Sequence, residues 1–514
     1  MVLITSSAYI TPDLMAEFGK IPPAFLPLGN KRLYEYQIRL FKSLGEKIIL
    51  SLPYSYQTQN TKILQQEGVE IIYVPDNLSL KESVLYCINL NLPFDEHLHI
   101  LHGDTLFESL EFSHPNALSI AKTQENYEWA YLFDNHQSTL TFANPIKKDK
   151  NLIFTGYVSI SHPYAFIQSL VRQSSFMESL KDYSKSFPFY AQRNDTWLDF
   201  GILTTYFSSK GHLFASRHFN TLNKTQEYVN KQSHWGAKIG AEIFWFENLP
   251  QELQLYVPRF YKQSAQSYKL EYLYCNTLAE LFVFGRLPSY VWKNIFLKCK
   301  KFLTKLHSYS PQNPKNLLID FDYKSKTLAR LREFSKQTSL SLSQAWEFNG
   351  IQTPCLLEIV ESLDSFVQDC EISLIHGDFC FSNIMYDFRS SSIKTFDPRG
   401  MDFSGSFTNG GDETYDYAKL MHSCIGLYDF ILAGFYELEI SHNKIKFTIQ
   451  TESQVKEIQK IFIKVFGLKT KKAVEAKMIH LFLSMLSLHN DENKKQMALL
   501  ANVFRLYHNF KDSK

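Results

Sequence analysis

Three polar residues at fixed offsets constrain this chain more than any other feature. Asp378 closes a His-Gly-Asp triplet, Asn383 follows five residues later, and Asp397 follows fourteen residues after Asn383. Apolar residues before the triplet and between Asn383 and Asp397 predict a strand, a loop and a further strand, which brings Asp397 back beside Asn383. Transfer of a phosphoryl group from ATP requires a carboxylate that accepts the proton of the attacking hydroxyl, and oxygen ligands for magnesium. The spacing therefore predicts a phosphoryl-transfer site with Asp378 as the base and Asn383 and Asp397 as metal ligands.

The segment Leu374–Met385, with Asp397-Pro398 after it, resembles the catalytic loop and metal-binding segment of the aminoglycoside phosphotransferase and choline kinase superfamily. The resemblance implies an α+β two-lobed protein-kinase-like domain that uses ATP. In that family the Asp of the triplet is the catalytic base, and the Asn and the later Asp bind Mg²⁺. The alternative is a polar surface loop in which Asp378 and Asn383 only cap turns.

Such kinases also need a lysine that reaches the phosphates and a helix glutamate that holds the lysine in place. Lys231, in the strand-like piece Tyr228–Ser233, and Glu242, on a predicted helix from Lys238, fill these roles, with Lys238 as the competing lysine. The segment Ser267–Tyr272 resembles the last strand and hinge of the small lobe, so Glu271 and Tyr272 are the expected adenine contacts. The alternatives are a solvated ion pair and an ordinary edge strand. No glycine-rich phosphate loop precedes Lys231.

A different pattern opens the chain, where Met1–Thr5 predicts a first strand rather than a leader peptide. The loop Gly19–Leu33 follows, and it resembles the opening of sugar-nucleotide pyrophosphorylases and phosphocholine cytidylyltransferases. The resemblance implies an α/β Rossmann-like domain with a mixed sheet that binds CTP or another nucleoside triphosphate. The family's Gly-x-Gly-Thr-Arg loop is missing and Pro23 stands where its phosphate-contacting lysine falls, so Lys20 or Lys31 must supply the positive charge. For either lysine the alternative is plain surface solvation.

Two further segments support the second resemblance. Asp104 follows the apolar run that ends in His102-Gly103, which places it at the carboxyl edge of a parallel sheet, where open α/β folds bind ligands. Asp199 lies in Trp-x-Asp-x-Gly, similar to the segment that carries the second metal-binding Asp of sugar-nucleotide pyrophosphorylases. Two carboxylates suit magnesium on a triphosphate. The alternative for each Asp is a turn former, and the three histidines near Asp104 are interpreted as packing or surface groups.

Composition limits the remaining function classes. The 514 residues include 54 basic and 52 acidic ones, so no broad basic field for nucleic acid exists. Seven scattered cysteines without Cys-x-x-Cys spacing predict neither a disulfide framework nor a zinc site, which favours a cytoplasmic protein. No apolar run reaches the ~18 residues of a membrane span. A weakly periodic polar stretch near 218–226 predicts a boundary between domains 1–222 and 223–514.

These patterns together predict a bifunctional enzyme. Its kinase would phosphorylate a small alcohol or sugar, and its nucleotidyltransferase would join the product to a nucleotide with release of pyrophosphate. The family resemblance suggests a role in surface polysaccharide synthesis in capsule-forming bacteria. One alternative is a kinase fused to an inactive nucleotide-binding or scaffold domain, and another is a kinase fused to a glycosyltransferase, against which the lack of Asp-x-Asp near Asp104 argues. The acceptor, the nucleotide base and the presence of a homo-oligomer stay open.

Overall fold

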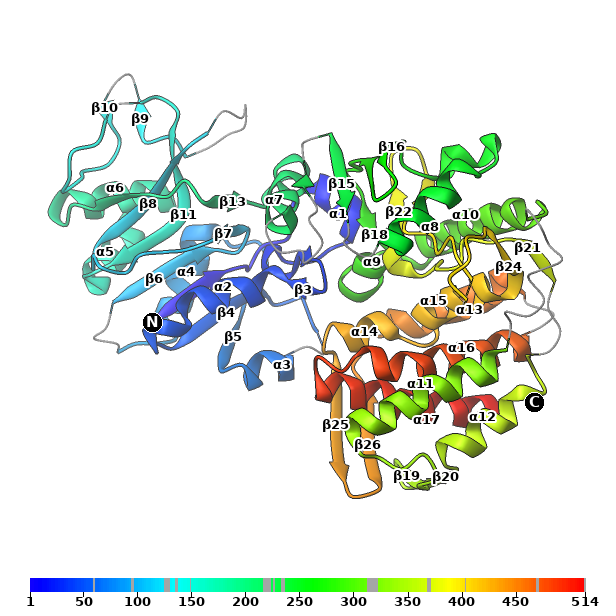
Figure 1. Cartoon of the computed structure of the whole chain (residues 1–514). Helices are drawn as coiled ribbons and strands as arrows, with labels where there is room; N and C mark the ends of the chain where they lie inside the picture. The colour runs from blue at the N-terminus through cyan, green and yellow to red at the C-terminus, as the bar shows by residue number, and fades with distance from the viewer. Residues whose placement is uncertain are drawn as a thin grey trace. The chain divides into compact units, whose positions relative to one another are not determined.

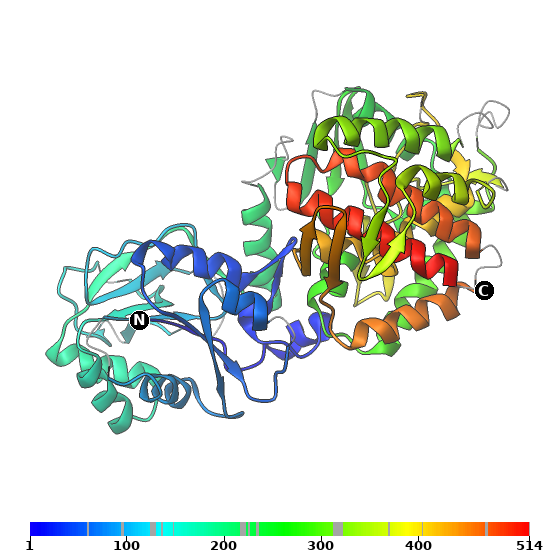
Figure 2. The same ribbon diagram turned by 90° about the horizontal axis from the view of Figure 1, so that it is seen from below.

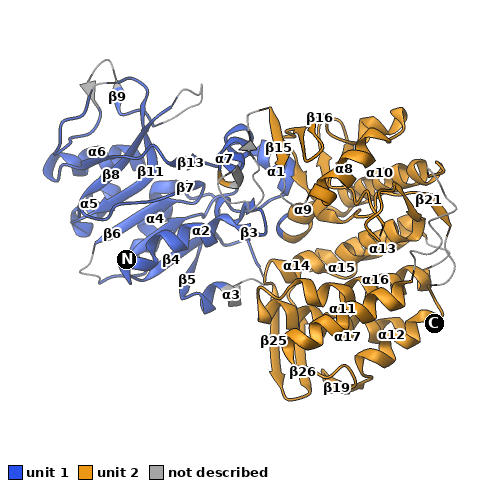
Figure 3. Ribbon diagram, viewed as in Figure 1, with its two compact units in different colours: residues 1–212, 284–286 blue, residues 213–283, 287–514 orange. Residues whose placement is uncertain are grey.

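The chain forms two compact units (Figure 3). The computed structural model describes residues 1–512 except 59–60, 94–96, 124–129, 135–136, 148, 216–222, 225–226, 233–235, 312–321, 368–370, 403 and 468–470. Unit 1 comprises residues 1–212 and 284–286, and unit 2 comprises residues 213–283 and 287–514. The stretch 218–226, where the sequence predicts the boundary, lies outside the described residues except for 223–224.

Unit 1 is built on a seven-stranded mixed sheet (Figure 1). Its strands, in spatial order, are β12 (Tyr190–Arg193), β8 (Ala117–Lys122), β11 (Leu152–Ile160), β6 (Leu98–His102), β1 (Val2–Thr5), β4 (Ile48–Pro53) and β5 (Val69–Val74). The four strands from β6 to β5 run parallel, β11 runs antiparallel to both β6 and β8, and β12 runs parallel to β8. All four residues of β1 are buried, as expected of a parallel strand covered on both faces.

Helices cover this sheet and complete its core. They are α1 (Pro12–Phe18), α2 (Leu33–Phe41), α3 (Thr61–Gln66), α4 (Leu80–Asn89), α5 (Pro163–Arg172), α6 (Phe176–Ser186) and α7 (Leu203–Ala215). Apolar side chains of α4, α5 and α6 share one hydrophobic cluster with β1, β4, β6, β8 and β11. Two short ribbons stand outside the sheet, β2 (Pro27–Leu28) with β3 (Lys31–Arg32), and β7 (Thr105–Phe107) with β13 (Trp197–Asp199). The α/β class with a mixed Rossmann-like sheet, predicted for the N-terminal half, is confirmed.

Unit 2 begins with a small β-rich lobe. Its antiparallel sheet has the order β14 (Asn223–Lys224), β15 (Tyr228–Gln232), β17 (Ser267–Glu271) and β16 (Phe260–Ser264), and α8 (Gly236–Glu247) accompanies it. The helix begins two residues before the predicted start at Lys238.

The larger lobe of unit 2 is mainly helical. Its helices are α9 (Leu278–Phe284), α10 (Ser289–His307), α11 (Tyr323–Thr338), α12 (Leu356–Asp364), α13 (Glu413–Cys424), α14 (Tyr428–Leu432), α15 (Gln454–Phe466), α16 (Lys471–Met485) and α17 (Asn493–Asp512). Helix α16 packs against α11, α13 and α17, and both Figure 1 and Figure 2 show the red α16 and α17 beside the yellow-green α11. A small sheet of β19 (Trp346–Phe348), β20 (Ile351–Thr353), β25 (Tyr436–Ser441) and β26 (Lys444–Ile449) flanks them. The predicted α+β two-lobed protein-kinase-like class is confirmed.

The strand, loop and strand predicted around the His-Gly-Asp triplet are present. Strand β21 (Ile372–Leu374) pairs with β24 (Gly410–Asp412) before the triplet. After it, β22 (Ile384–Asp387) and β23 (Ser392–Thr395) form a hairpin. A third strand, β18 (Asn276–Thr277), pairs with the free edge of β22. In the described part of the chain, no helix combines the length and apolar character needed to cross a membrane. Six described cysteines carry free thiols, and Cys370 lies outside the described residues.

A buried ion pair ties α16 to the start of α13. The Lys477 ammonium contacts the Asp412 carboxylate, and neither side chain is exposed to solvent. The Tyr323 hydroxyl of α11 also donates to Asp412 Oδ2, at 2.9 Å. Removing one partner of such a pair leaves an uncompensated buried charge, which destabilises proteins far more than the loss of an exposed pair.

We therefore expect Lys477→Met to lower the free energy of unfolding by about 3–5 kcal/mol, measured by urea denaturation. The control is Lys471→Met on the same helix, because Lys471 pairs with Glu475 at 3.4 Å with a partly exposed side chain. Lys471→Met should lower the free energy of unfolding by no more than about 1 kcal/mol. Equal losses in the two variants would contradict the expectation.

Candidate functional site

The His-Gly-Asp triplet of unit 2 is held by its backbone as well as by its side chains. The buried Asp416 carboxylate of α13 accepts hydrogen bonds from the amides of His376 (2.9 Å) and Gly377 (2.8 Å). The buried His376 ring bonds the Thr395 hydroxyl through Nε2 at 2.8 Å, and the Trp245 indole of α8 donates to the Ile375 carbonyl at 2.8 Å. These bonds connect the loop to α13, β23 and α8. Contacts with three elements therefore hold the backbone that leads to Asp378.

Gly377 occupies the one position in this loop that requires glycine. Its φ of +76° lies in the left-handed region, and a Cβ there would approach the Arg399 side chain to 2.7 Å. Both the backbone conformation and the space therefore select glycine at this place.

Asp378 follows directly and is held by two groups. Asn383 Nδ2 donates to its Oδ2 and to its carbonyl oxygen, each at 3.0 Å, and Lys419 Nζ of α13 lies 2.8 Å from its Oδ1. Burial raises the pKa of this carboxyl, but the Lys419 ammonium and the Asn383 bond outweigh that effect and hold the pKa below its ordinary value. The side chain is 38% exposed, so an ionised carboxylate faces solvent and can accept a proton.

The predicted lysine and glutamate of the small lobe meet. Lys231 Nζ of β15 lies 2.7 Å from Glu242 Oε2 of α8 and 2.8 Å from Asp397 Oδ1. Burial lowers the pKa of Lys231, but the two carboxylates outweigh it and raise the pKa. Glu242 is fully buried and also accepts a bond from the Tyr268 hydroxyl. The competing Lys238 is exposed on α8.

Asp397 is positioned by an unusual backbone. Its φ is +54°, which non-glycine residues rarely adopt and which is concentrated at functional sites. The preceding residue, Phe396, donates its amide to the Asn383 carbonyl at 3.2 Å, so the two predicted metal-binding segments lie side by side. One carboxylate and one amide oxygen, with phosphate oxygens and water, are a donor set that Mg²⁺ accepts. The residues present thus fit the ion.

The residues predicted to form a hinge, Glu271 and Tyr272, lie at the end of β17. The amide of Glu271 donates to the Arg259 carbonyl at 2.9 Å, and the amide of Tyr272 donates to the Glu227 carbonyl at 2.8 Å. Because both amides are engaged within the small lobe, an adenine contact from these two residues would have to use their carbonyl oxygens. Burial raises the pKa of the Tyr272 hydroxyl.

Unit 1 brings its two predicted carboxylates together through the β7–β13 ribbon. Asp199 pairs with Thr105 in the ladder, and the amide of Phe200 donates to the Asp104 carbonyl at 2.8 Å. A Cβ built on Gly201 would lie 3.2 Å from Asp104 Oδ2 and 3.4 Å from Asp199 Oδ1. Both carboxylates therefore border the same small space, where a single magnesium ion can be reached by both. Among the described residues no group of three or more His, Cys, Asp or Glu forms a candidate metal site.

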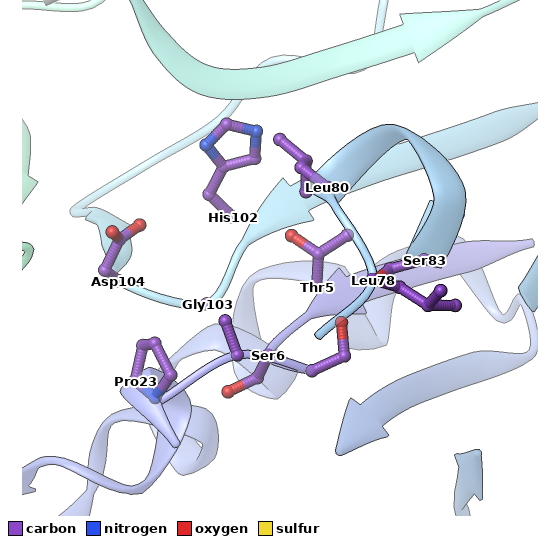
Figure 4. Close-up of a pocket in the computed structure, with 11 residues that line it drawn as sticks. Thr5, Ser6, Pro23, Leu78, Leu80, Ser83, His102, Gly103 and Asp104 are labelled. Carbon is purple, nitrogen blue, oxygen red and sulfur yellow. The ribbon is translucent and has the colours of Figure 1, made fainter. Parts of the chain in front are cut away.

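A cavity of about 180 Å³ adjoins Asp104 (Figure 4). It lies at the carboxyl ends of β1 and β6 and is lined by Thr5, Ser6, Ser7, Ala8, Pro23, Leu78, Leu80, Ser83, His102, Gly103 and Asp104. The Gly103 position allows the two strand ends to approach, because a Cβ there would meet the Thr5 carbonyl at 2.6 Å. Small hydroxyl and apolar groups form most of the lining, which suits a nucleoside better than a bare phosphate chain.

Neither predicted lysine of unit 1 lines this cavity. Lys20 lies over the Tyr9 ring, 4.1 Å from its centroid, and Lys31 pairs with Glu35 at 3.3 Å. The three histidines near Asp104 were interpreted from the sequence as packing or surface groups, but one of them, His102, lines the cavity, and burial lowers its pKa. The available signal was its position at the end of β6, two residues before Asp104. His99 instead packs in the core, stacked on Tyr157.

Lys419 was also missed, although the sequence held a signal for it. It follows Asp416 by three residues, so both lie on one face of α13. Other acidic residues near this helix have structural contacts: Asp412 pairs with Lys477, and Asp402 accepts hydrogen bonds from the amides of Ser404 and Ser406 at 2.9 and 2.8 Å.

Comparison with known proteins gives likenesses of fold. No protein-family model and no curated protein sequence matches the chain. Similar solved structures include a UDP-glucose pyrophosphorylase complexed with UDP-glucose, with 14% identity and a TM-score of 0.31 over 42% of this chain and 98% of that one. The inositol-1-phosphate CTP transferase from T. maritima has 18% identity and a TM-score of 0.30, over 40% and 90%. The gentamicin-APH(2")-IIa complex has 16% identity and a TM-score of 0.34, over 54% and 85%. Values this low say nothing of substrate, so the chemistry rests on the residues above.

One buried acid near the unit 2 site is expected to make stability depend on pH. Asp429 of α14 is buried, and burial raises its pKa to about 6. A carboxyl whose pKa is raised on folding stabilises the fold below its unfolded value of 3.8, and this contribution is lost as pH rises through about 6.

Asp429→Asn should therefore raise the free energy of unfolding relative to the wild type at pH 8, by up to about 3 kcal/mol, and by about half as much at pH 5. Thermal melts at the two pH values measure this difference, with Asp491→Asn, at an exposed position, as the matched control. If the variant and the wild type differ in free energy of unfolding by the same amount at pH 5 and at pH 8, the pKa of Asp429 is not raised.

Proposed function

We propose that unit 2 is a kinase that transfers the γ-phosphoryl group of ATP to a hydroxyl of a small alcohol or sugar. The observation that carries this proposal is the convergence of Asp378, Asn383, Asp397 and the Lys231–Glu242 pair from separate elements. Lys231 would bind phosphate oxygens, and Asn383 and Asp397 would hold Mg²⁺, which neutralises charge on the phosphates when bound.

In the reaction, the acceptor oxygen forms a bond to the γ-phosphorus and the bond from that phosphorus to the bridging oxygen of ADP breaks. The hydroxyl proton passes to Asp378, and ADP leaves with the electron pair of the broken bond. The ionised state of Asp378, favoured by Lys419 and Asn383, supports its role as the acceptor of this proton. The acceptor and its hydroxyl are to be found by screening the purified protein with ATP against alcohols and sugars, with mass detection of products.

Asp378→Asn should lower kcat for phosphoryl transfer by about 10²- to 10⁴-fold and leave ATP binding nearly unchanged, because it removes the proton acceptor. The matched control is Asp387→Asn, since Asp387 only accepts bonds in the turn after β22. Turnover on the acceptor found in the screen and calorimetric ATP affinity give the two readouts. Wild-type turnover in Asp378→Asn would remove Asp378 from the mechanism.

For unit 1 we propose nucleotidyl transfer from CTP or another triphosphate to the phosphorylated product of the kinase, with release of pyrophosphate. The shared space between Asp104 and Asp199 supports it, because both carboxylates can hold Mg²⁺ beside the cavity at the ends of β1 and β6. No lysine or arginine is among the described residues that line the cavity, which favours the alternative, a nucleotide-binding or scaffold unit without catalysis. The coupled activities suit a cytoplasmic enzyme that makes an activated precursor for surface polysaccharides.

Asp104→Asn and Asp199→Asn should each lower pyrophosphate release at least about a hundredfold, by loss of a charged metal ligand, and spare the kinase. Asp195→Asn is the control, because Asp195 is exposed and pairs only with Arg193 among the contacts described. Pyrophosphate is measured with each triphosphate and the phosphorylated acceptor. If the wild type releases none while its kinase works, unit 1 is a binding domain.

A further inference from the structure

Lys419 is a largely covered cation beside Asp378 in the proposed kinase site, and the mechanism above uses its charge only to keep Asp378 ionised. Its side chain is 17% exposed, and Nζ lies 2.8 Å from Asp378 Oδ1. The same helix face carries Asp416, which binds the backbone of the His-Gly-Asp loop. Helix α13 therefore positions Asp378 in two ways. Asp416 holds the backbone of the loop, and Lys419 contacts the Asp378 carboxylate.

The other lysine of the site already has two carboxylate partners. Lys231 lies between Glu242 and Asp397, so part of its positive charge is offset before any phosphate binds. The transferred phosphoryl group spreads negative charge over three peripheral oxygens in the transition state. It must pass close to the ionised Asp378, which repels it. Lys419 is placed where a positive charge offsets that repulsion.

We propose that Lys419 is a second catalytic residue, whose ammonium binds a peripheral oxygen of the transferred phosphoryl group while it remains beside Asp378. This inference rests on the proposed kinase function and adds a group to it. The ammonium donates hydrogen bonds and keeps its protons, so the balance of the transfer is unchanged. Three donors on one Nζ allow contacts to the carboxylate and to a phosphoryl oxygen at the same time.

A purely electrostatic role, in which Lys419 only keeps Asp378 ionised, makes a different prediction. Without Lys419, burial raises the pKa of Asp378, and the acidic limb of the kcat–pH profile moves upward. High pH would then ionise Asp378 again and restore full turnover. If Lys419 contacts the phosphoryl group, kcat of the variants should instead stay below that of the wild type on the alkaline plateau of the kcat–pH profile.

Other groups around Asp378 also enter such a profile. Those that face Asp378 or Lys419 are His376 and Cys380 of the loop, His422 and Tyr415 of α13, and Tyr428 of α14, with Asp429 of α14 facing Cys380. Burial lowers the pKa of both histidines and raises the pKa of Cys380 to about 12. In the wild type the Lys419 charge lowers the pKa of Cys380, His422 and Tyr428. Without that charge the pKa of Cys380 and of Tyr428 moves further upward, so both groups stay protonated at the alkaline pH where the variants are compared.

The test compares the wild type with Lys419→Gln and Lys419→Met, from pH 5 to pH 9, on the acceptor found by the screen. Lys419→Gln keeps a hydrogen-bond donor for Asp378 and is the second variant in case Lys419→Met fails to fold. Lys324→Met is the matched control, because Lys324 of α11 pairs with the exposed Glu361 of α12 and not with Asp378. Melting temperatures and ATP affinities are measured for each protein.

We expect kcat of Lys419→Gln at pH 9 to remain at least tenfold below the wild type, with the acceptor KM within threefold. Recovery of wild-type kcat at pH 9 would overturn the inference and leave the kinase proposal standing. A rise in KM for an anionic acceptor with unchanged kcat would also overturn it, because Lys419 would then bind the acceptor. A wild type that phosphorylates nothing in the screen would overturn the kinase proposal, and this inference with it.

Discussion

The unit 2 site depends on two hydrogen bonds that the buried Asp416 carboxylate accepts from the backbone amides of His376 and Gly377. A buried carboxylate must be satisfied by donors, and here two of its contacts are backbone amides of the loop. If the loop moved, the carboxylate would lose both amides and, of the described residues, keep only the His307 ring, which lies 3.2 Å from its Oδ2. Because Asp378 comes next in the chain and Lys419 lies one turn along the same helix, Asp378 and Lys419 are both positioned by α13.

The composition of the candidate site in unit 2 was largely predictable because its residues lie in short sequence segments. The triplet, Asn383 and Asp397 have fixed spacings, and apolar flanks identified the strands that return Asp397 to the loop. Lys231 and Glu242 were identified on a strand and a helix of the small lobe, and the structure brings them together. Lys419 escaped because its partner is forty-one residues earlier in sequence, and only the packing of α13 against the loop joins them.

Unit 1 shows where such prediction ends. The α/β class was implied by the family resemblance, and Asp104 and Asp199 were identified from their local sequence. The approach of these two residues depends on the ribbon of β7 and β13, which pairs residues ninety or more positions apart. Lys20 and Lys31 were named only because a positive charge was needed, and their surroundings, an aromatic ring and a neighbouring glutamate, are set by side-chain packing that no local pattern records.

Residues 284–286, which belong to unit 1, lie far along the chain from the rest of that unit. Gly19 forms a bridge with Arg286, at a place where a Cβ would lie 2.2 Å from the Arg286 carbonyl oxygen, and Arg286 donates its amide to the Phe18 carbonyl. The buried Arg32 lies against Phe25 and Phe284. No single cut of the polypeptide therefore yields two complete modules. An ancestor made by joining two independent genes end to end would have had to acquire this shared strap later, and the exchange of either half for a relative would break it.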